Sequence, residues 1–296
     1  MILYAPAKIN LYLKVLNKRS DGYHNIETVF ERIALYDKII LRKSDKIKVL
    51  CNNSNVPTDK NSLIYKTISL FKERAGVSKG VEVKIFKKIP VASGLGGGSS
   101  DAASLLGGLS KFWGSSLDPA CLLKIGRSLG ADIAFFLNKA SFAFAGERGD
   151  RIIPFEWKEA KFWHLLISPP VKTLSKDIYQ MFSNEIRKKP FSRLTKGMRI
   201  NKILSPGLMA TKPKKMKNAI RNDLERVVLK VQPIVNRLKA ALGHIGLTHS
   251  MVSGSGPSVF SLFEKRKEAM RAKGLLVKRF PFVKGKGWRI FIVPTA

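Results

Sequence analysis

A glycine-rich segment between a strand pattern and a helix pattern constrains the fold of this chain more than any other feature. Apolar and polar residues alternate over 81–89, which predicts a strand, and apolar residues recur at helical spacing over 101–113. Glycines between them let backbone N–H groups turn toward an anion, and the start of the helix adds partial positive charge. The segment predicts a phosphate-binding loop. Its residues are Pro90, Val91, Ala92, Ser93, Gly94, Leu95, Gly96, Gly97, Gly98, Ser99 and Ser100.

This loop differs from two common nucleotide-binding fingerprints. No Gly-Lys-Ser/Thr closes it, as in a Walker A motif, and its glycines do not fit the G-x-G-x-x-G spacing. Ser99 and Ser100 are placed to cap the helix or to donate to a phosphate oxygen, and Asp101 suits the first helical turn. A glycine-rich turn that only packs tightly stays open as the alternative.

The charge of the chain is extreme, with 54 Lys and Arg against 21 Asp and Glu in 296 residues, a formal net charge of +33. Nucleic-acid binding is one interpretation, but the basic residues are dispersed and no nucleic-acid motif accompanies them. The net charge is better explained by a generally basic proteome or by a positive electrostatic field that attracts polyanionic small substrates. We therefore expect no nucleic-acid partner. The stretch 187–222 has no acidic residue, and its charge density predicts that it is partly mobile and exposed.

The composition is that of a globular protein, with 45% hydrophobic residues and a mean hydropathy of −0.05. No signal-peptide pattern is visible and no apolar run approaches the roughly 20 residues that span a bilayer, so we expect no membrane partner. Cys51 and Cys121 are the only cysteines, and neither has a partner at metal-ligand spacing. Reduced thiols in the cytoplasm account for them most simply.

The chain alternates strand and helix patterns from end to end. Strands are predicted over 2–4, 9–16, 27–33, 38–41, 141–145, 151–155, 164–168 and 258–263, and helices over 61–75, 119–129 and 222–243, the last interrupted at Pro233. The Pro169-Pro170 pair marks a candidate boundary between a lobe 1–168 and a lobe 169–296. The fold class expected is α+β, in two lobes.

Three further motifs carry groups that could act on a bound phosphate. Lys8 and Asn10 share one face of a predicted strand, and Asp132 stands beside a predicted helix end. If Lys8 and Asp132 meet, the ammonium holds the carboxylate ionised and oriented toward a substrate hydroxyl; a structural salt bridge is the alternative. The motif Gly22-Tyr23-His24 could stack on a base or form a surface turn, and the Ser253-Gly254-Ser255-Gly256 turn could approach a phosphate or close a hairpin.

The order of these motifs resembles the GHMP kinase superfamily. Pro6-Ala7-Lys8-Ile9-Asn10 and Gly22-Tyr23-His24 are most similar to the members that phosphorylate the C2 hydroxyl of 4-diphosphocytidyl-2-C-methyl-D-erythritol in the non-mevalonate isoprenoid pathway. The resemblance covers nearly the whole chain. It implies an ATP-dependent small-molecule kinase with a ribosomal-protein-S5-like N-terminal lobe and a ferredoxin-like C-terminal lobe.

The resemblance also assigns roles to residues. It implies that ATP lies along the phosphate loop with adenine near Leu63 and Lys87, and that Asp132 acts as base or orienter with Lys8. The substrate residues it implies are Asn10, Tyr23, His24, Ser175 and Tyr179. Ser175 and Tyr179 are a hydroxyl and an aromatic ring four residues apart; Thr173 is the rival hydroxyl, but Asp177 follows it at that spacing and cannot stack. The turn Gly254-Ser255-Gly256 is a candidate to lie near the phosphates.

The resemblance also predicts the cofactors, and the chain differs from the family pattern at two positions. We expect ATP with Mg²⁺ held mostly by nucleotide oxygens and water, with no dedicated protein metal cage and with Ser99 or Ser100 as hydroxyl ligands. Glu147 stands where the family usually has glycine and Ala134 where it usually has proline.

Two alternative functions stay open. One is a mevalonate- or homoserine-type kinase of the same fold, and the less favoured one is an RNA-binding S5-like protein. The protein is expected to be a monomer or a homodimer.

Overall fold

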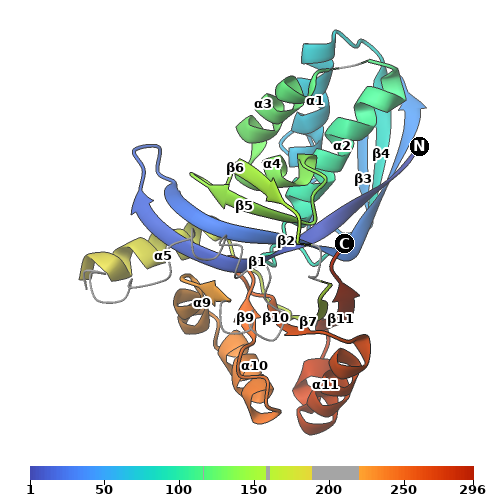
Figure 1. The fold of residues 1–296 in the computed structure, drawn as a ribbon. Coiled ribbons are helices and arrows are strands. Elements are labelled where there is room, and N and C mark those ends of the chain that lie inside the picture. Colours follow the sequence, from blue (N-terminus) through green and yellow to red (C-terminus); the bar gives the residue numbers. More distant parts are fainter. Residues whose placement is uncertain (116, 158–160, 189–219) are drawn as a thin grey trace.

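The computed structural model describes residues 1–115, 117–157, 161–188 and 220–296 (Figure 1). Most of the stretch 187–222, which we predict to be partly mobile, lies outside the described residues. Within the described part, strands and helices alternate in two sheets with helices packed on them, so the predicted α+β class is confirmed.

The first sheet is built on two long antiparallel strands, β1 (Ile2–Lys18) and β2 (His24–Ser44). The short strands predicted in this region are parts of these two, because shifts of register after Pro6 and Asn10 let the pairing continue through irregular points. The other strands of this sheet are β3 (Ile47–Cys51), β4 (Gly80–Phe86), β5 (Phe142–Gly146), β6 (Arg151–Phe155) and β8 (Arg221–Asn222). Among the described residues the sheet has seven strands in the order β3-β4-β2-β1-β8, with β5 on β2 and β6 on β5.

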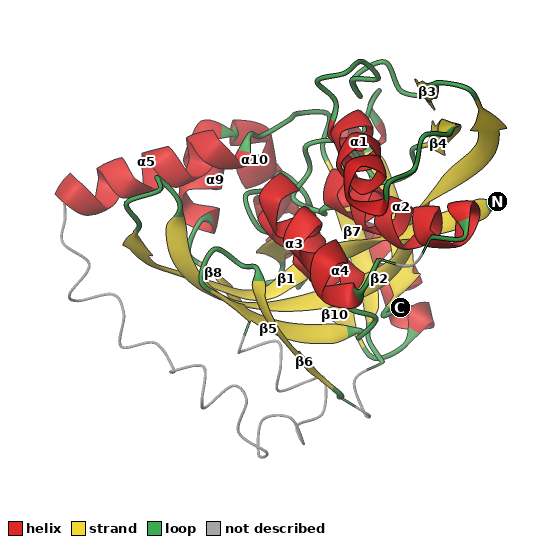
Figure 2. Ribbon diagram, turned by 90° about the horizontal axis from the view of Figure 1, so that it is seen from above, coloured by secondary structure: helices red, strands yellow, loops and turns green. Residues whose placement is uncertain are grey.

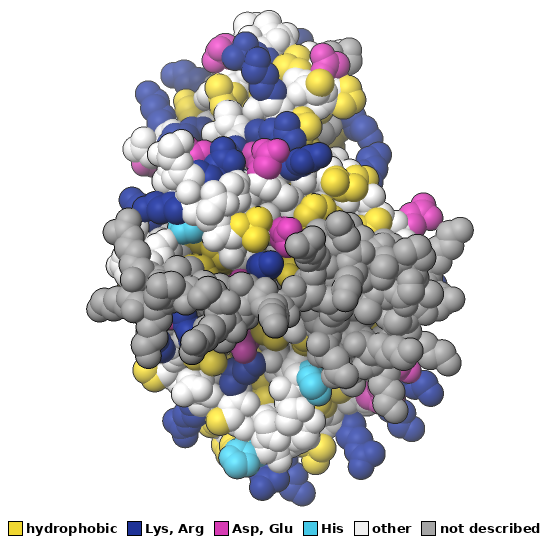
Figure 3. All heavy atoms as spheres, turned by 60° about the vertical axis from the view of Figure 1, so that its left-hand side comes forward, with side chains coloured by type: hydrophobic (Ala, Val, Ile, Leu, Met, Phe, Trp, Pro, Cys, Tyr) yellow, Lys and Arg dark blue, Asp and Glu magenta, His cyan; other side chains and the backbone are white. Residues whose placement is uncertain are grey.

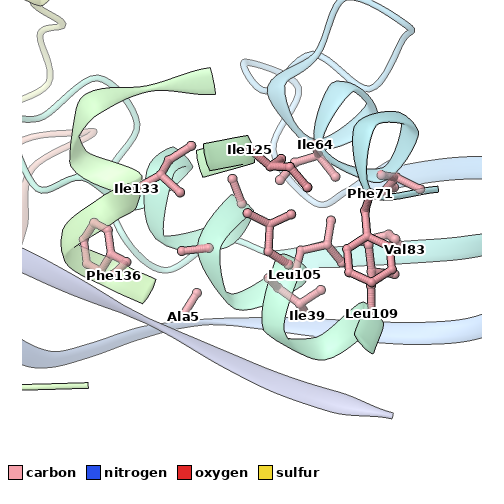
Figure 4. Packing of buried hydrophobic residues seen from close by; sticks show 14 of the residues in the cluster. Ala5, Ile39, Ile64, Phe71, Val83, Leu105, Leu109, Ile125, Ile133 and Phe136 are labelled. Atoms are coloured by element: carbon pink, nitrogen blue, oxygen red, sulfur yellow. The ribbon is translucent and has the colours of Figure 1, made fainter. Parts of the chain in front are cut away.

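Four helices cover one side of this sheet, as Figure 2 shows from above. They are α1 (Leu63–Ala75), α2 (Gly97–Trp113), α3 (Pro119–Leu129) and α4 (Ala131–Leu137). Ser62 caps α1 by accepting from Tyr65 N at 3.1 Å, and Asp118 caps α3 by accepting from Cys121 N at 2.7 Å. Their apolar faces meet the sheet in a buried cluster, seen close up in Figure 4. This packing fixes the positions at which α2 and α4 begin.

The second sheet lies on the other side of β1 and β2 in Figure 1 and carries the C-terminal helices. Its strands are antiparallel in the order β11-β7-β10-β9, namely β7 (Trp163–Ser168), β9 (Met251–Val252), β10 (Val259–Phe263) and β11 (Arg289–Pro294). Its helices are α5 (Ser175–Lys188), α9 (Glu225–Val231), α10 (Pro233–His244) and α11 (Arg266–Arg279), followed by the 3₁₀ turn η2 (Pro281–Lys284). The helix predicted over 222–243 is divided at Pro233, as expected.

The two lobes exchange strands at their edges. β7 precedes Pro169 yet pairs with β10 and β11, whereas β8 follows residue 169 yet pairs with β1. The division into 1–168 and 169–296 stays a prediction. These pairings indicate that the chain first passes from the first sheet to the second before Trp163. None of the helices in the described part of the chain is long and apolar enough to cross a membrane.

Candidate active site

The glycine-rich loop begins its helix earlier than the sequence pattern suggests. α2 starts at Gly97, with Gly96 as the N-cap residue, and the first intrahelical bond runs from Ser100 N to Gly96 O at 2.9 Å. The N–H groups of Gly97, Gly98 and Ser99 therefore have no acceptor within the helix and are free to donate to an anion.

Two predictions for this turn are corrected. No side chain caps α2, so Ser99 and Ser100 are not cap residues, and Asp101 lies beyond the first turn. The physical reason is that Gly96 adopts the left-handed conformation, with φ 69°, and turns the chain into the helix four residues before the apolar pattern begins.

The loop is held tightly by its surroundings. Gly94 also has a positive φ of 79°, and Ser93 Oγ donates to Pro90 O at 2.6 Å. A Cβ on Gly96 would lie 2.9 Å from the Phe136 ring and 3.0 Å from Lys8 Cγ. Only glycine fits at this point, and the Lys8 side chain runs directly beneath the loop. Pro90, Val91, Ala92 and Leu95 complete the loop around these contacts.

Lys8 and Asp132 are brought together, as predicted. Lys8 Nζ lies 3.5 Å from Asp132 Oδ2 and donates to Asn10 Oδ1 at 2.7 Å. The Lys8 side chain is 6% exposed, whereas that of Asp132 is 35% exposed. Asp132 thus has one oxygen near a buried ammonium and remains accessible from solvent, which suits a group that meets a substrate hydroxyl.

A hydrogen-bond chain orients this pair from behind. Asn10 Nδ2 donates to Thr28 Oγ1 at 2.8 Å, and Thr28 Oγ1 donates to Tyr12 O at 2.6 Å. Because Thr28 uses its only proton on a carbonyl, it must accept from Asn10, and this fixes the Asn10 amide with its oxygen toward Lys8. Thr28 is fully buried and nothing in the sequence pattern singles it out.

The second glycine turn lies against the first. Thr173 Oγ1 is within hydrogen-bond distance of the carbonyls of Ser255 and Gly256, at 2.9 and 2.6 Å, and Thr173 N donates to Ala92 O at 3.2 Å. A Cβ on Gly254 would lie 3.0 Å from Asn10 Oδ1 and 3.6 Å from Lys8 Nζ. The turn predicted to approach the phosphates therefore closes on the Lys8–Asn10 pair.

Asn222 fixes the same turn and was missed by the sequence analysis. Its Nδ2 donates to Val252 O at 2.8 Å and to Gly254 O at 2.7 Å, while its Oδ1 accepts from Leu224 N at 2.9 Å. The two carbonyls that hold the turn lie 30 and 32 positions further along the chain, so no local motif reveals this role of Asn222.

Two residues are expected near adenine, Leu63 and Lys87. Leu63 is the first residue of α1 and lies beside the phosphate loop, since a Cβ on Gly98 would be 3.9 Å from its Cδ2. The Lys87 side chain is buried, forms an ion pair with Asp37 and lies 2.7 Å from Asp101 Oδ2. Burial opposes protonation of Lys87, but Asp101 and Asp37 outweigh it and raise its pKa. Because its ammonium is already taken, adenine contact by Lys87 stays a prediction for which this geometry gives no support.

The residues expected at the cytosine end meet on β2 and α5. The rings of His24 and Tyr179 stack with centroids 5.3 Å apart, and His24 Nε2 lies 2.7 Å from Ser183 Oγ. Burial lowers the pKa of His24, and Lys18 adds to this. Burial raises the pKa of Tyr179, and Asp132 raises it further. Ser175, at the start of the same helix as Tyr179, contacts Ser255 of the second glycine turn, and that turn lies against Lys8.

Ser175 and Tyr23 flank that pair. Ser175 Oγ lies 2.7 Å from Ser255 Oγ, so the predicted hydroxyl is exposed beside the second glycine turn. Tyr23 is exposed, and the Arg148 guanidinium lies over its ring at 5.2 Å from the centroid. Its stacking on a base stays a prediction.

The described residues contain no group of three or more His, Cys, Asp or Glu side chains that could hold a metal ion. The phosphate loop does carry an unsatisfied hydroxyl, since Ser100 Oγ is buried and has no hydrogen-bond partner there.

Comparisons with known proteins agree with this arrangement. The family model for the GHMP kinases N terminal domain matches residues 62–139, which span the phosphate loop and Asp132, and the model described as GHMP kinases C terminal matches residues 205–276. A solved homoserine kinase from Cytophaga hutchinsonii has the same fold, with a TM-score of 0.73 and 18% identity over 100% of this chain and 94% of that chain.

Curated relatives match over nearly the whole length. A protein of Acetivibrio thermocellus named 4-diphosphocytidyl-2-C-methyl-D-erythritol kinase is 35% identical over 99% of this chain and 98% of its own. A protein of Caldicellulosiruptor saccharolyticus with the same name is 36% identical over 92% and 91%. A crystal structure of 4-(cytidine 5'-diphospho)-2C-methyl-D-erythritol kinase superposes with a TM-score of 0.76 and 27% identity over 100% of both chains. The chain therefore belongs to the GHMP kinases, and within them to the family of the 4-diphosphocytidyl-2-C-methyl-D-erythritol kinases.

Proposed function

We propose that this protein transfers the γ-phosphoryl group of ATP to the C2 hydroxyl of 4-diphosphocytidyl-2-C-methyl-D-erythritol. The observation that carries the proposal is the contact of Lys8 with Asp132 beneath a loop whose N–H groups are free to donate. An anion site, a cation and an accessible carboxylate in one place are what phosphoryl transfer to an alcohol requires.

The roles follow from charge and position. Phosphoryl transfer needs alignment and neutralisation of the charge that develops on the phosphate oxygens. The N–H groups of Gly97, Gly98 and Ser99 supply neutralisation at the loop, and Lys8 supplies a positive charge below it. Asp132 orients the acceptor hydroxyl and takes its proton. The Lys8 ammonium holds the Asp132 carboxylate in place, and Asn10 Oδ1 holds that ammonium.

Mg²⁺ fits this site as an ion held mainly by the nucleotide. Bound there, the ion would neutralise charge on the phosphate oxygens. The described residues offer no group of three or more acidic or other metal-binding side chains, but Ser100 Oγ is buried without a hydrogen-bond partner at the first turn of α2 and is the hydroxyl that would hold the ion. Ser99 is the neighbouring hydroxyl, partly exposed on the same turn.

The cytidyl end of the substrate is assigned to the residues on β2 and α5. His24 and Tyr179 present stacked rings, Tyr23 adds an exposed ring one residue before His24, and Ser175 adds an exposed hydroxyl. Flat aromatic groups suit a pyrimidine better than they suit the bare polyol or amino-acid substrate of a mevalonate- or homoserine-type kinase. That substrate class remains the alternative for the same fold.

The positive charge does not require a nucleic-acid partner. On the face shown in Figure 3, Lys and Arg side chains are scattered among acidic and uncharged ones and form no continuous stripe over the coloured atoms. A dispersed field attracts a substrate that carries a diphosphate as well as ATP. We also propose a cytoplasmic protein that acts as a monomer or homodimer.

A coupled assay of ADP release tests the proposal. Mg-ATP is supplied with the cytidyl substrate, with mevalonate or with homoserine, and we expect turnover only with the cytidyl substrate. Turnover only with another alcohol would contradict the substrate and leave the kinase assignment standing. Absence of turnover with all three, in folded protein, would contradict the proposal itself.

A further inference from the structure

Ser183 stands behind the aromatic pair and has no role in the function proposed above. It lies on α5, one helical turn after Tyr179, and is buried. Its Oγ donates to Tyr179 O at 3.1 Å and lies 2.7 Å from His24 Nε2. The hydroxyl therefore joins the helix backbone to the imidazole of a strand residue 159 positions earlier in the chain.

The protons of this arrangement can be counted. A carbonyl oxygen only accepts, so the bond to Tyr179 O uses the single proton of the Ser183 hydroxyl. Both hydrogen bonds exist together only if His24 donates from Nε2. Burial lowers the pKa of His24, with Lys18 adding to the effect, so the ring is neutral at physiological pH and carries no second proton.

We infer that Ser183 is a specificity-determining positioning residue, which fixes His24 as the Nε2–H tautomer and leaves Nδ1 as a hydrogen-bond acceptor toward the substrate. Among the described residues, no hydrogen bond reaches Nδ1. A neutral imidazole has one donor and one acceptor, and the partner of one nitrogen decides the role of the other.

This tautomer makes the site discriminate between a cytidyl substrate and its uridyl analogue, a consequence that rests on the proposed function. Cytosine carries an exocyclic amino group, a donor that pairs with an acceptor Nδ1. Uracil carries a carbonyl at the same position, which would face the lone pair of Nδ1 with no proton between them. A buried polar group left unpaired is strongly rejected, so the Ser183–His24 bond selects the cytidyl substrate over its uridyl analogue.

Variants at position 183 test the inference through the ratio of the two substrates. For Ser183→Ala we expect kcat/KM with the cytidyl substrate to fall by about tenfold, mainly through KM, and the preference over the uridyl analogue to shrink by a similar factor. Ser183→Thr keeps the hydroxyl and should restore the preference. A preference unchanged in Ser183→Ala would overturn the inference, because loss of fold alone lowers the rate with both substrates equally.

A spectroscopic measurement needs no variant. Nitrogen-15 NMR distinguishes the protonated from the unprotonated ring nitrogen, and the chain has only four histidines. We expect the His24 signals to show a protonated Nε2 and a bare Nδ1, and His24→Gln in parallel assigns them. If Nδ1 carries the proton while the enzyme turns over the cytidyl substrate, the inference fails and the proposed function stands. If neither cytidyl nor uridyl substrate is turned over, the proposed function fails instead.

Discussion

Ser253 lies directly against Gly94, so the two glycine-rich turns of the chain are in contact although they are 159 residues apart. Ser253 Oγ donates to Gly94 O at 3.0 Å, and a Cβ on Gly94 would lie 2.1 Å from Ser253 O. The phosphate loop is thus braced by the C-terminal lobe, and its shape depends on a close approach of two backbones.

The first prediction concerns this approach. Gly94→Ala places a Cβ into a backbone carbonyl at a φ of +79°, so the loop must move. We expect kcat/KM to fall at least about a hundredfold, through loss of the donors aligned on the phosphates. Steady-state kinetics measures it.

Gly107→Ala is the matched control. Gly107 lies in the middle of α2, and a Cβ there has nothing within 4 Å. The variant should keep its activity and gain about 0.5–1 kcal/mol of stability from helix propensity. Equal activity in the two variants would contradict the role of the Gly94–Ser253 contact.

The phosphate loop was predictable because its signal is local. Strand, glycines and helix follow one another, and the residues that match a family motif are contiguous. The start of α2 was not predictable, because glycine favours loops, and only the tertiary setting makes Gly97 helical. A Cβ there would lie 2.9 Å from Ile89 and 3.1 Å from Lys87 Nζ.

The supporting residues were missed for another reason. Thr28, Thr173, Asn222 and Ser183 each form a hydrogen bond to a backbone or side-chain group that lies 16 to 159 positions away. Hydroxyl and amide side chains are common in any sequence, and spacing does not mark the ones that meet a distant partner. The meeting of Lys8 with Asp132 could be expected, but the chain from Asn10 through Thr28 that orients it could not.

The second prediction tests the Lys8–Asp132 pair. Asp132→Asn keeps the shape and removes the proton acceptor, so kcat should fall by about 10²–10⁴-fold while ATP still binds. Lys8→Met should weaken both catalysis and nucleotide binding, because its charge lies beneath the loop. Single-turnover kinetics and calorimetric titration with an ATP analogue separate the two effects.

Lys48→Met is the control for Lys8. Lys48 is also paired with a carboxylate, Glu82 at 3.3 Å, but its side chain is 59% exposed on the outer strand β3. An exposed pair contributes little, so this variant should retain full activity. Full activity in Asp132→Asn would rule out Asp132 as the base.

The third prediction is a pH dependence of stability from the buried triad of Asp37, Lys87 and Asp101. Burial raises the pKa of Asp101 to about 7, with Lys87 lowering it and Asp37 raising it. An unfolded aspartate titrates near pH 4, so between about pH 4 and 7 the folded state binds more protons than the unfolded state. Stability therefore falls as pH rises through this window.

Asp101→Asn removes this dependence. The triad then holds one ammonium and one carboxylate, so at about pH 8 the variant should be more stable than the parent protein, and the gap should close toward pH 4. Urea unfolding at several pH values measures it, with exposed Asp45→Asn as the control. Parallel pH profiles for Asp101→Asn and the parent would refute the assignment.

The fourth prediction concerns Glu147, which by the resemblance described above stands at a usual glycine position of the family. Its φ of 56° is left-handed, and its backbone carbonyl accepts from Ile26 N at 2.7 Å, so the conformation is held in place. Glu147→Gly relieves the strain and should stabilise the protein by about 0.5–1 kcal/mol, net of the added freedom of the unfolded chain. Glu73→Gly, on the exposed face of α1, should instead destabilise by about 1 kcal/mol. A change of the same sign in both would show that Glu147 carries no strain.

The last prediction concerns Asn222, which holds the second glycine turn from behind. The Asn222 amide donates to the carbonyls of Val252 and Gly254. Asn222→Asp places a carboxylate oxygen opposite these two carbonyl oxygens, and their repulsion pushes the turn away from Lys8 and Asn10. We expect kcat to fall by more than about tenfold, with KM for ATP changing less, because the turn approaches the reacting pair rather than the nucleotide base. Asn236→Ala, an exposed asparagine on α10, is the control and should leave both parameters unchanged. If Asn222→Asp alters stability but not kcat, the turn does not position the reacting groups, and Lys8 and Asp132 are held by the β1 and α4 contacts alone.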